Sequence, residues 1–315
     1  MDKHAQQPAA PLVSVLIPAF NHERFVQRCL DSVLEDPYPN KELVIVDDGS
    51  SDATAARIAD WIAQHGERLH VRFWQRENLG TAATLNHLVA MSSGEFLRLG
   101  ASDDYLLPGG LGAQVAYLRA QPHKAAVIGD AIVVDAHGQT LHQSSMRDLH
   151  GVDKRLYRSE AGIRRAVIQQ WAVSGAVVLI RRSAMQGAVG WDEDLRIEDW
   201  DFFLRLVARD ALGFVDVPVC AYRVHATNTS RTRHLPSRLA NLAESRQVAL
   251  RHARLFDPVS RTLLQAQAHH IAAKLAFLRW RPLALGGHLL AYAGLSLLAC
   301  LRRDVADSST MAKHA

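Results

Sequence analysis

The stretch ELVIVDDGSSDAT, residues 42–54, contains the pattern on which the fold prediction depends. Its first half is a continuous apolar, β-branched run, which indicates a strand that is buried on both faces. The run ends in two adjacent aspartates and a Gly-Ser-Ser turn, and this turn can cap a helix that begins near Ala53. A buried strand that passes through a short polar turn into a helix is the repeating unit of a parallel α/β sheet.

Similar units occur on both sides of this stretch. The spacing predicts strands over 12–20, 70–76 and 95–100, and helices over 24–35 and 81–93. This alternation with short loops predicts a parallel sheet that is covered by helices. Because ligands of such sheets bind beyond the carboxyl ends of the strands, we expect the loops after Ala19, Val46 and Leu99 to meet in one crevice.

The pattern becomes less regular after Pro108. We predict a strand with a turn over 125–141, a mobile polar loop over 142–160, a strand over 174–185, an amphipathic helix over 198–210 and a broken strand over 213–225. From about Ser237 the chain is predicted to be helical, with Asp257 and Pro258 starting a long helix and Pro282 ending it.

Composition and charge exclude several classes of protein. The chain has 315 residues and a net charge of +4, with 48% hydrophobic residues, which is typical of a globular protein. It has no long Lys/Arg run of the kind that nucleic-acid tails show, so no nucleic-acid partner is predicted. The three cysteines lie far apart and the N-terminus is polar, so we expect reduced thiols and a cytoplasmic location.

One C-terminal segment has a composition suited to a membrane. Residues 283–301 carry no charged side chain and are flanked by arginines on both sides. Nineteen residues just reach the length that spans a bilayer, but glycines, a histidine and a serine dilute the apolar run. We expect a helix that lies on the inner face of the cytoplasmic membrane or packs under the rest of the protein.

Polar residues at the predicted strand ends are candidates for ligand binding. Phe20 could stack on a flat base, while Asn21 and Glu23 could contact a ribose; equally, Phe20 suits a core and Asn21 a turn. Asp47 and Asp48 end the second strand, where a carboxylate can accept a hydrogen bond from a base and Gly49 lets the backbone approach a ligand closely. Ordinary Asp-Gly-Ser turn chemistry remains the alternative.

The adjacent acids Asp103 and Asp104 follow the strand at 95–100. Mg²⁺ or Mn²⁺ prefers carboxylate oxygens and is usually held by one or two of them together with substrate phosphates. Vicinal acids at a strand end suit a cation site of this kind. A solvated turn that precedes a helix at Pro108 is the alternative.

Two further groups carry candidate chemistry. Glu198 and Asp199 lie in the first turn of a predicted helix, where acids either complement the helix dipole or, beside the aromatic Trp200, act as a general base. Arg223 and His225 end a strand and suit a pyrophosphate, although a lone histidine is more often structural.

The order of the segments IPAFN, VDDGSSD, NLGTAATLN, SDD, GWDEDLRIEDWDF and YRVH resembles that of the inverting family 2 glycosyltransferases, over residues 12–230. The resemblance implies a GT-A-type parallel or mixed sheet flanked by helices, with a C-terminal helical extension. It implies a nucleotide-sugar-binding half at 12–107 and an acceptor-binding half at 108–232. Outside it, the residues themselves predict a flexible N-terminus at 1–11 and a helical region at 233–315 that could associate with a membrane.

The resemblance also implies roles for individual residues. The donor site would comprise Pro18, Phe20, Asn21, Glu23, Asp47, Asp48, Asp103 and Arg223. Asp104 and His225 would hold Mn²⁺ or Mg²⁺, Asp199 would be the catalytic base, and Glu198 and Trp200 would lie on the acceptor side.

The implied activity is metal-dependent, inverting transfer of a sugar from a UDP- or dTDP-linked donor to a glycan or lipid-linked acceptor, in bacterial surface polysaccharide synthesis. Leu85 stands where the family often has arginine, so a catalytically impaired nucleotide-binding protein is one alternative. A nucleotidyltransferase is a weaker one, because the first loop lacks a Gly-rich basic segment. An oxidoreductase is disfavoured by the absence of GxGxxG from the sequence.

Overall fold

The structure is a computed structural model, and it describes residues 10–170, 175–185, 190–226, 228 and 234–314, the last twelve of these as backbone only. The flexible N-terminus predicted at 1–11 therefore lies, up to residue 9, outside the described residues. The chain forms two compact units. Unit 1 combines residues 1–144, 174–190 and 215–223, and unit 2 combines 145–173, 191–214 and 224–315.

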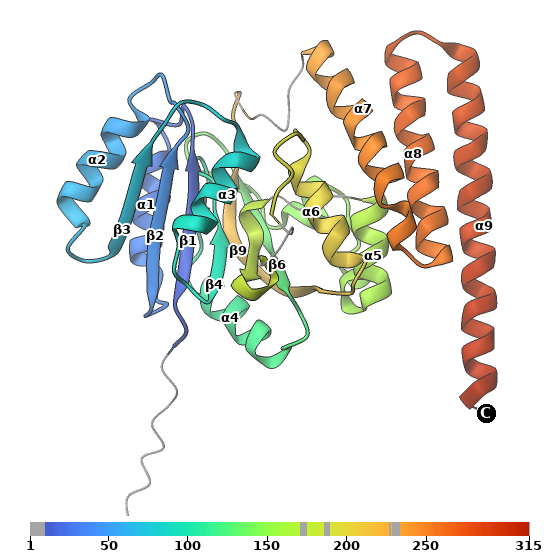
Figure 1. The fold of residues 1–315 in the computed structure, drawn as a ribbon, viewed down its shortest axis with the longest axis horizontal. Coiled ribbons are helices and arrows are strands. Elements are labelled where there is room, and N and C mark those ends of the chain that lie inside the picture. Colours follow the sequence, from blue (N-terminus) through green and yellow to red (C-terminus); the bar gives the residue numbers. More distant parts are fainter. Residues whose placement is uncertain (1–9, 171–174, 186–189, 227, 229–233, 315) are drawn as a thin grey trace, which may run out of the picture. The chain divides into compact units, whose positions relative to one another are not determined.

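A mixed sheet of nine strands forms the centre of unit 1, in the order β3-β2-β1-β4-β8-β6-β9-β5 with β7 paired to β6 (Figure 1). The strands are β1 Val13–Ala19, β2 Lys41–Asp47, β3 His70–Gln75, β4 Phe96–Leu99, β5 Tyr105–Leu106, β6 Ala126–Val134, β7 Thr140–His142, β8 Val178–Arg181 and β9 Leu212–Arg223. The first four are parallel, and β8 joins β4 in antiparallel orientation. The predicted α/β class is confirmed.

Helices cover this sheet because its central strands are apolar on both faces. They are α1 Val26–Glu35, α2 Thr54–His65, α3 Thr81–Met91 and α4 Gly110–Ala120. Cys29 and Leu30 of α1 pack in one core cluster with Val15 and Ile17 of β1. Figure 1 shows α3 across the opposite face of the sheet, and it contacts β1 and β2. The central strands β1, β2 and β4 are thereby almost fully buried.

Two predictions for the second half are wrong in detail. The strand predicted as broken is continuous, because Pro218 lies in a partly exposed part of β9, where the missing N–H does not interrupt a buried ladder. The segment predicted as a mobile loop at 142–160 contains the short helices η1 Ser145–Leu149 and η2 Lys154–Arg158. Met146, Val152 and Tyr157 are buried and anchor this segment.

Unit 2 is mainly helical. Its main helices are α5 Glu160–Gln169, α6 Glu198–Val207, α7 Leu235–His252, α8 Pro258–Leu278 and α9 Pro282–His314. Asp257 starts α8 as predicted, since its side chain accepts hydrogen bonds from the N–H groups of Val259 and Ser260. The predicted apolar segment lies within α9. Pro282–Arg302 is long and apolar enough to cross a membrane, with 6% of it buried, although one such helix is weak evidence for spanning.

Candidate functional site

The loops after β1, β2 and β4 meet in unit 1, as the sequence predicts. Asn21 has a left-handed backbone (φ 53°). Its side-chain oxygen accepts a hydrogen bond from Ser51 N at 2.8 Å, and its own N–H donates to Ser50 Oγ at 2.9 Å. His22 Nδ1 lies 2.8 Å from Ser102 Oγ, which ties the first loop to the loop after β4. The convergence therefore rests on specific hydrogen bonds.

Several residues predicted to bind the donor have structural partners here. Glu23 accepts a hydrogen bond from Ala53 N at 2.9 Å, so it caps α2. Pro18 lies within β1 opposite Val46 of β2. Phe20, at the end of β1, is 45% exposed, and its ring is accessible to a ligand.

Asp47 and Asp48 are both buried and organise the turn after β2. Asp47 accepts hydrogen bonds from the N–H and the hydroxyl of Ser50. Asp48 accepts from Arg76 Nε at 3.0 Å, Leu79 N at 3.1 Å and Gly80 N at 2.9 Å. Asp48 therefore fixes the segment from residue 76 to residue 80 beside the strand ends.

Gly49 allows this turn to form. Its φ is +79°, a conformation that L side chains rarely adopt, and an added Cβ would lie 2.7 Å from Asn78 N. The turn after β2 thus requires glycine at this position.

The adjacent acids after β4 have different surroundings. Asp104 is 4% exposed, and its Oδ1 accepts a hydrogen bond from Arg223 N at 2.8 Å. Burial, followed by the charge of Asp103, raises the pKa of Asp104 well above its ordinary value. The side chain of Asp103 is 13% exposed, and its Oδ2 lies 3.7 Å from His22 Nε2. Of the two, Asp103 has its carboxylate beside a potential metal ligand.

Arg223 is buried against the same loop. Its Nε donates to Asp103 O at 2.8 Å and its Nη1 to Asp135 O at 3.0 Å. The guanidinium also lies over the rings of Phe25 and Tyr105, at 4.9 and 5.6 Å from the ring centroids. Arg223 therefore braces the loop that carries the two acids, through both its backbone and its side chain.

Sequence analysis did not assign roles to His22 or Arg98. His22 directly follows Asn21 in the segment PAFNHE. Its contact with Asp103 could not be predicted from this segment, because the two residues belong to separate loops. Arg98 is fully buried in β4 and donates to the carbonyl oxygens of Leu99 and Ala176, and its burial lowers its pKa. The sequence feature that could have singled out Arg98 is its position as the one cation within an otherwise apolar predicted strand.

A second group of predicted residues lies in unit 2, at the start of α6. Asp199 Oδ1 accepts a hydrogen bond from Trp200 N at 2.6 Å. Trp200 is 4% exposed and donates from Nε1 to Val167 O, so the indole belongs to the core of unit 2. Burial, with the neighbouring charges of Asp199 and Glu244, raises the pKa of Glu198 to about 8.

Helix α7 holds the turn that precedes α6. Glu244 accepts hydrogen bonds from Arg196 N and Ile197 N, each at 2.8 Å. At the C-terminal end of α7, His252 Nε2 lies 2.6 Å from Asp201 Oδ1. These contacts fix the helix start on which Glu198 and Asp199 lie.

His225 is also in unit 2. Its N–H donates to Asn228 Oδ1 at 2.6 Å, and its ring Nε2 lies 3.1 Å from Asn228 Nδ2. The structure thus brings together the predicted residues of the first loops, Asp103, Asp104 and Arg223 in unit 1. It brings together Glu198, Asp199 and Trp200 in unit 2.

Comparisons with known proteins agree with this architecture. The family model described as Glycosyl transferase family 2 matches residues 14–186. An uncharacterized protein from Mycobacterium tuberculosis is 31% identical over 242 residues, which are 73% of this chain and 72% of that protein.

Two solved structures are similar in fold at low sequence identity. The first is residues 1–349 of TarS from S. aureus in complex with UDP-GlcNAc. Its TM-score is 0.62 at 18% identity, with 90% of each chain covered. The second is the mannosyltransferase PcManGT from Pyrobaculum calidifontis in complex with GDP-Man and Mn²⁺. Its TM-score is 0.59 at 20% identity, and the match covers 92% of this chain and 88% of that one.

Proposed function

This chain belongs to glycosyl transferase family 2 and has the GT-A fold, and we propose that it moves a sugar from a nucleoside diphosphate donor to an acceptor hydroxyl with inversion. The observation that carries this proposal is the group of polar loops at the carboxyl ends of β1, β2 and β4. Phe20 is exposed at the end of β1, and His22 Nε2 of the same loop lies 3.7 Å from Asp103 Oδ2 of the loop after β4. The complexes of TarS with UDP-GlcNAc and of PcManGT with GDP-Man support an NDP-sugar as donor. A UDP- or dTDP-linked sugar is our proposal within that class.

The resemblance implied Asp104 as the metal ligand and Asp103 as a donor contact; we propose instead that Asp103 holds a divalent cation. Its carboxylate and the nearby imidazole of His22 form an O/N donor pair that fits Mn²⁺ or Mg²⁺, whereas Asp104 already accepts a hydrogen bond from Arg223 N. His225, two residues after Arg223, is proposed as a further ligand. When bound, the cation would offset the charge of the diphosphate as it leaves.

Asp199 is proposed as the general base. The raised pKa of Glu198 disfavours its charged form at neutral pH, so Asp199 is the member of the pair to which we assign this role. The acceptor oxygen attacks the anomeric carbon, the bond from that carbon to the diphosphate breaks, and the hydroxyl proton passes to Asp199. Phe20 would stack on the nucleoside base, and Arg223 would hold the loop of Asp103 in position.

The test is Asp199→Asn, assayed as release of nucleoside diphosphate from a panel of NDP-sugars with Mn²⁺. Transfer is expected to fall at least about 100-fold, the scale of general-base catalysis, while donor binding is unchanged. The matched control is Asp194→Asn, because Asp194 is an exposed acid on the same segment. Near-normal turnover in Asp199→Asn would contradict the assignment.

We also propose that the protein works in the cytoplasm, at the inner face of the membrane, on glycan or lipid-linked intermediates of surface polysaccharide. The exposed apolar surface of α9 supports this location, because 6% of its apolar window is buried. An acceptor that is bound to lipid would be presented at that surface.

A further inference from the structure

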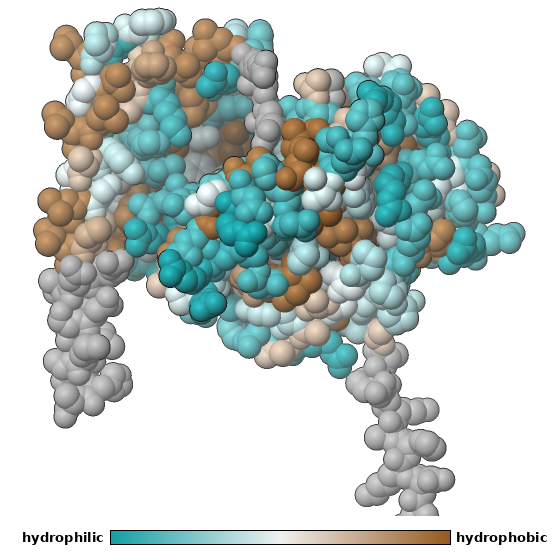
Figure 2. All heavy atoms as spheres, turned by 180° about the vertical axis from the view of Figure 1, so that it is seen from behind, coloured by the Kyte–Doolittle hydropathy of each residue, from teal (hydrophilic) through white to brown (hydrophobic). Residues whose placement is uncertain are grey.

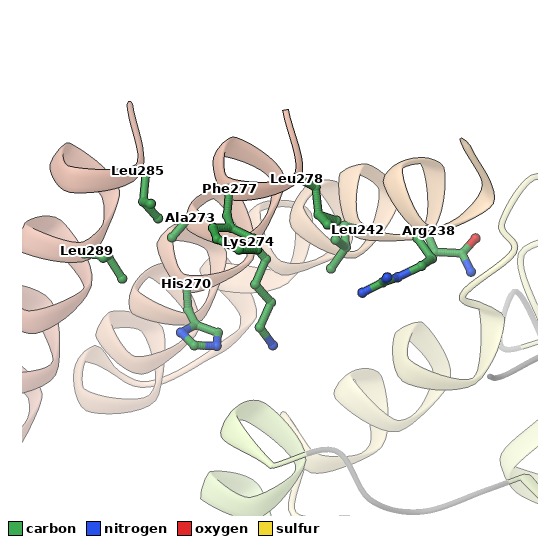
Figure 3. Close-up of a pocket in the computed structure, with 10 residues that line it drawn as sticks. Arg238, Leu242, His270, Ala273, Lys274, Phe277, Leu278, Leu285 and Leu289 are labelled. Atoms are coloured by element: carbon green, nitrogen blue, oxygen red, sulfur yellow. The ribbon is translucent and has the colours of Figure 1, made fainter. Parts of the chain in front are cut away.

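A pocket of about 560 Å³ lies between α7, α8 and α9 in unit 2 (Figure 3). Its apolar lining comprises Leu242, Ala273, Phe277, Leu278, Leu285 and Leu289. Its polar lining comprises Arg238, Asn241, His270 and Lys274. This volume is within the range of about 300–1,000 Å³ that is usual for pockets that bury a small ligand. None of these residues has a part in the proposed sugar transfer.

The charged groups of this pocket have one sign. Arg238 comes from α7 and Lys274 from α8, and no Asp or Glu is among the ten described residues that line the pocket. In Figure 3 both side chains extend into the space between the helices. Both residues are exposed, so their charges are accessible to a ligand. Two cations beside apolar walls complement an anionic group, such as a phosphate, that is attached to a hydrocarbon chain.

His270 provides a second, independent indication of a ligand. Its Nδ1 atom is buried and has no hydrogen-bond partner among the described residues. Burial and the charge of Lys274 lower the pKa of His270 and so favour its neutral form. An unpaired buried polar atom is unfavourable, and a ligand group that pairs with it would remove that cost.

Apolar surface continues from the pocket to the turn between α8 and α9. Phe277, which lines the pocket, is 64% exposed, and Trp280 and Leu283 are 90% and 93% exposed. Arg279 and Arg281 flank this group. Figure 2 shows apolar side chains gathered along this part of unit 2. Exposed tryptophan and leucine beside arginines are typical of a membrane interface, so a hydrocarbon chain could leave the pocket towards lipid.

We infer that this pocket binds the phosphate-bearing end of a lipid, with the phosphate on Arg238 and Lys274 and the first carbons along Leu242 and Phe277. Binding of the lipid phosphate does not depend on the proposed function. The role of this lipid as part of the acceptor does. Helix α7 links the two sites, because Glu244, two residues after Leu242, holds the turn before α6. A lipid-bound acceptor would thus be held by the helix that also positions the segment of Asp199.

The experiment measures binding of dodecyl phosphate to the full chain by calorimetry, in the absence of any donor sugar. Saturable binding to the unmodified protein is expected, and Arg238→Gln/Lys274→Gln is expected to weaken it at least tenfold. The matched control is Arg57→Gln/Arg254→Gln, which removes the same charge at exposed positions outside the pocket and is expected to bind normally. Circular dichroism and the Tm of each variant establish that it is folded.

Two further probes separate the contributions of head and chain. Dodecyl maltoside has the chain without the charge and inorganic phosphate has the charge without the chain, and both are expected to bind at least tenfold more weakly. Equal binding of dodecyl maltoside, or undiminished binding in Arg238→Gln/Lys274→Gln, would overturn the inference. Equal binding of inorganic phosphate would make this a free-phosphate site and overturn it as well. Asp199→Asn is expected to bind dodecyl phosphate normally, so failure of the lipid site is distinguishable from failure of the proposed transferase mechanism.

Discussion

Asp103 and Asp104 are neighbours in sequence, but they differ in burial and in the groups that their carboxylates contact. The carboxylate of Asp104 is buried and accepts a hydrogen bond from Arg223 N, whereas the carboxylate of Asp103 lies near the imidazole of His22. The sequence shows two equivalent carboxylates, and only the loop geometry separates them. The hydrogen bond that distinguishes Asp104 joins residues 119 positions apart, which no local pattern encodes.

This difference predicts opposite effects of alanine at the two positions. Asp103→Ala should abolish the activation of transfer by Mn²⁺ with a smaller loss of stability than Asp104→Ala, because Asp103 is less buried than Asp104. Asp104→Ala should lower the free energy of unfolding by about 1–3 kcal/mol, because Arg223 N loses its partner in a buried environment. Titration of activity with Mn²⁺ and urea denaturation measure the two effects.

Asp104→Asn is the control for this pair, since the amide oxygen can still accept from Arg223 N and the raised pKa of Asp104 already favours an uncharged side chain. It should be nearly as stable as the unmodified protein. Loss of Mn²⁺ activation in Asp104→Asn, with full activation in Asp103→Ala, would instead identify Asp104 as the metal ligand.

Glu198 predicts a specific dependence of stability on pH. Its folded pKa of about 8 exceeds its ordinary value of 4.5, so between these values the folded state binds more protons than the unfolded state. Stability is therefore greatest towards the acid side of this window and falls as pH rises through 8. Each unit of pKa difference corresponds to about 1.4 kcal/mol.

Glu198→Gln should remove this contribution. The urea midpoint of the variant is expected to exceed that of the unmodified protein at pH 9 and to approach it at pH 5. The control is Glu67→Gln, which changes an exposed acid on unit 1 and should leave the pH dependence as it was. Parallel pH profiles for Glu198→Gln and the unmodified protein would show that Glu198 titrates normally.

At the scale of elements, β1 and β2 were predictable because each is a largely apolar run that is almost fully buried. The shorter runs of β3 and β4 each include an arginine and were predictable because apolar residues flank it. The two-residue strand β5 was not, since Tyr105–Leu106 is too short to carry a periodic pattern. The segment 142–160 was misjudged for the opposite reason. Its polar composition conceals the three buried hydrophobic side chains of Met146, Val152 and Tyr157, and their burial depends on tertiary partners that the local sequence does not reveal.

The start of α8 offers a test of capping that separates hydrogen bonding from charge. Asp257 accepts from Val259 N and Ser260 N, and its other oxygen pairs with Arg164 at 2.7 Å. Asp257→Ala loses both contributions and should destabilise the protein by about 1–2 kcal/mol. Asp257→Asn keeps the cap and should cost less than half as much, measured by urea denaturation. Equal effects of the two variants would mean that the ion pair with Arg164, not the cap, stabilises this helix start.

At the scale of the whole molecule, the fold class could be predicted from the order of strands and helices. The division of the chain into two compact units could not. Unit 1 takes residues from three separate parts of the sequence, because β8 and most of β9 return to the first sheet. Sequence analysis divides the chain into contiguous ranges and does not show that distant segments join one unit. The halves at 12–107 and 108–232 remain a prediction. The helical character of the last third was predictable from its proline and capping residues. The exposure of the apolar side chains of α9 was not, because it depends on how the helices pack.

That exposed surface predicts how the protein associates with membranes. Leu290 and Leu297 of α9 are 76% and 63% exposed, so replacing them costs little folding energy while removing apolar area that a bilayer could cover. The unmodified chain should float with vesicles that contain anionic lipid and be released by carbonate, as expected of a peripheral helix. Leu290→Glu/Leu297→Glu should abolish flotation, whereas Gln247→Glu/Gln265→Glu, with the same added charge on exposed faces of α7 and α8, should not. Retention after carbonate treatment would show that α9 spans the bilayer, and flotation of the leucine variant would show that another surface makes the contact.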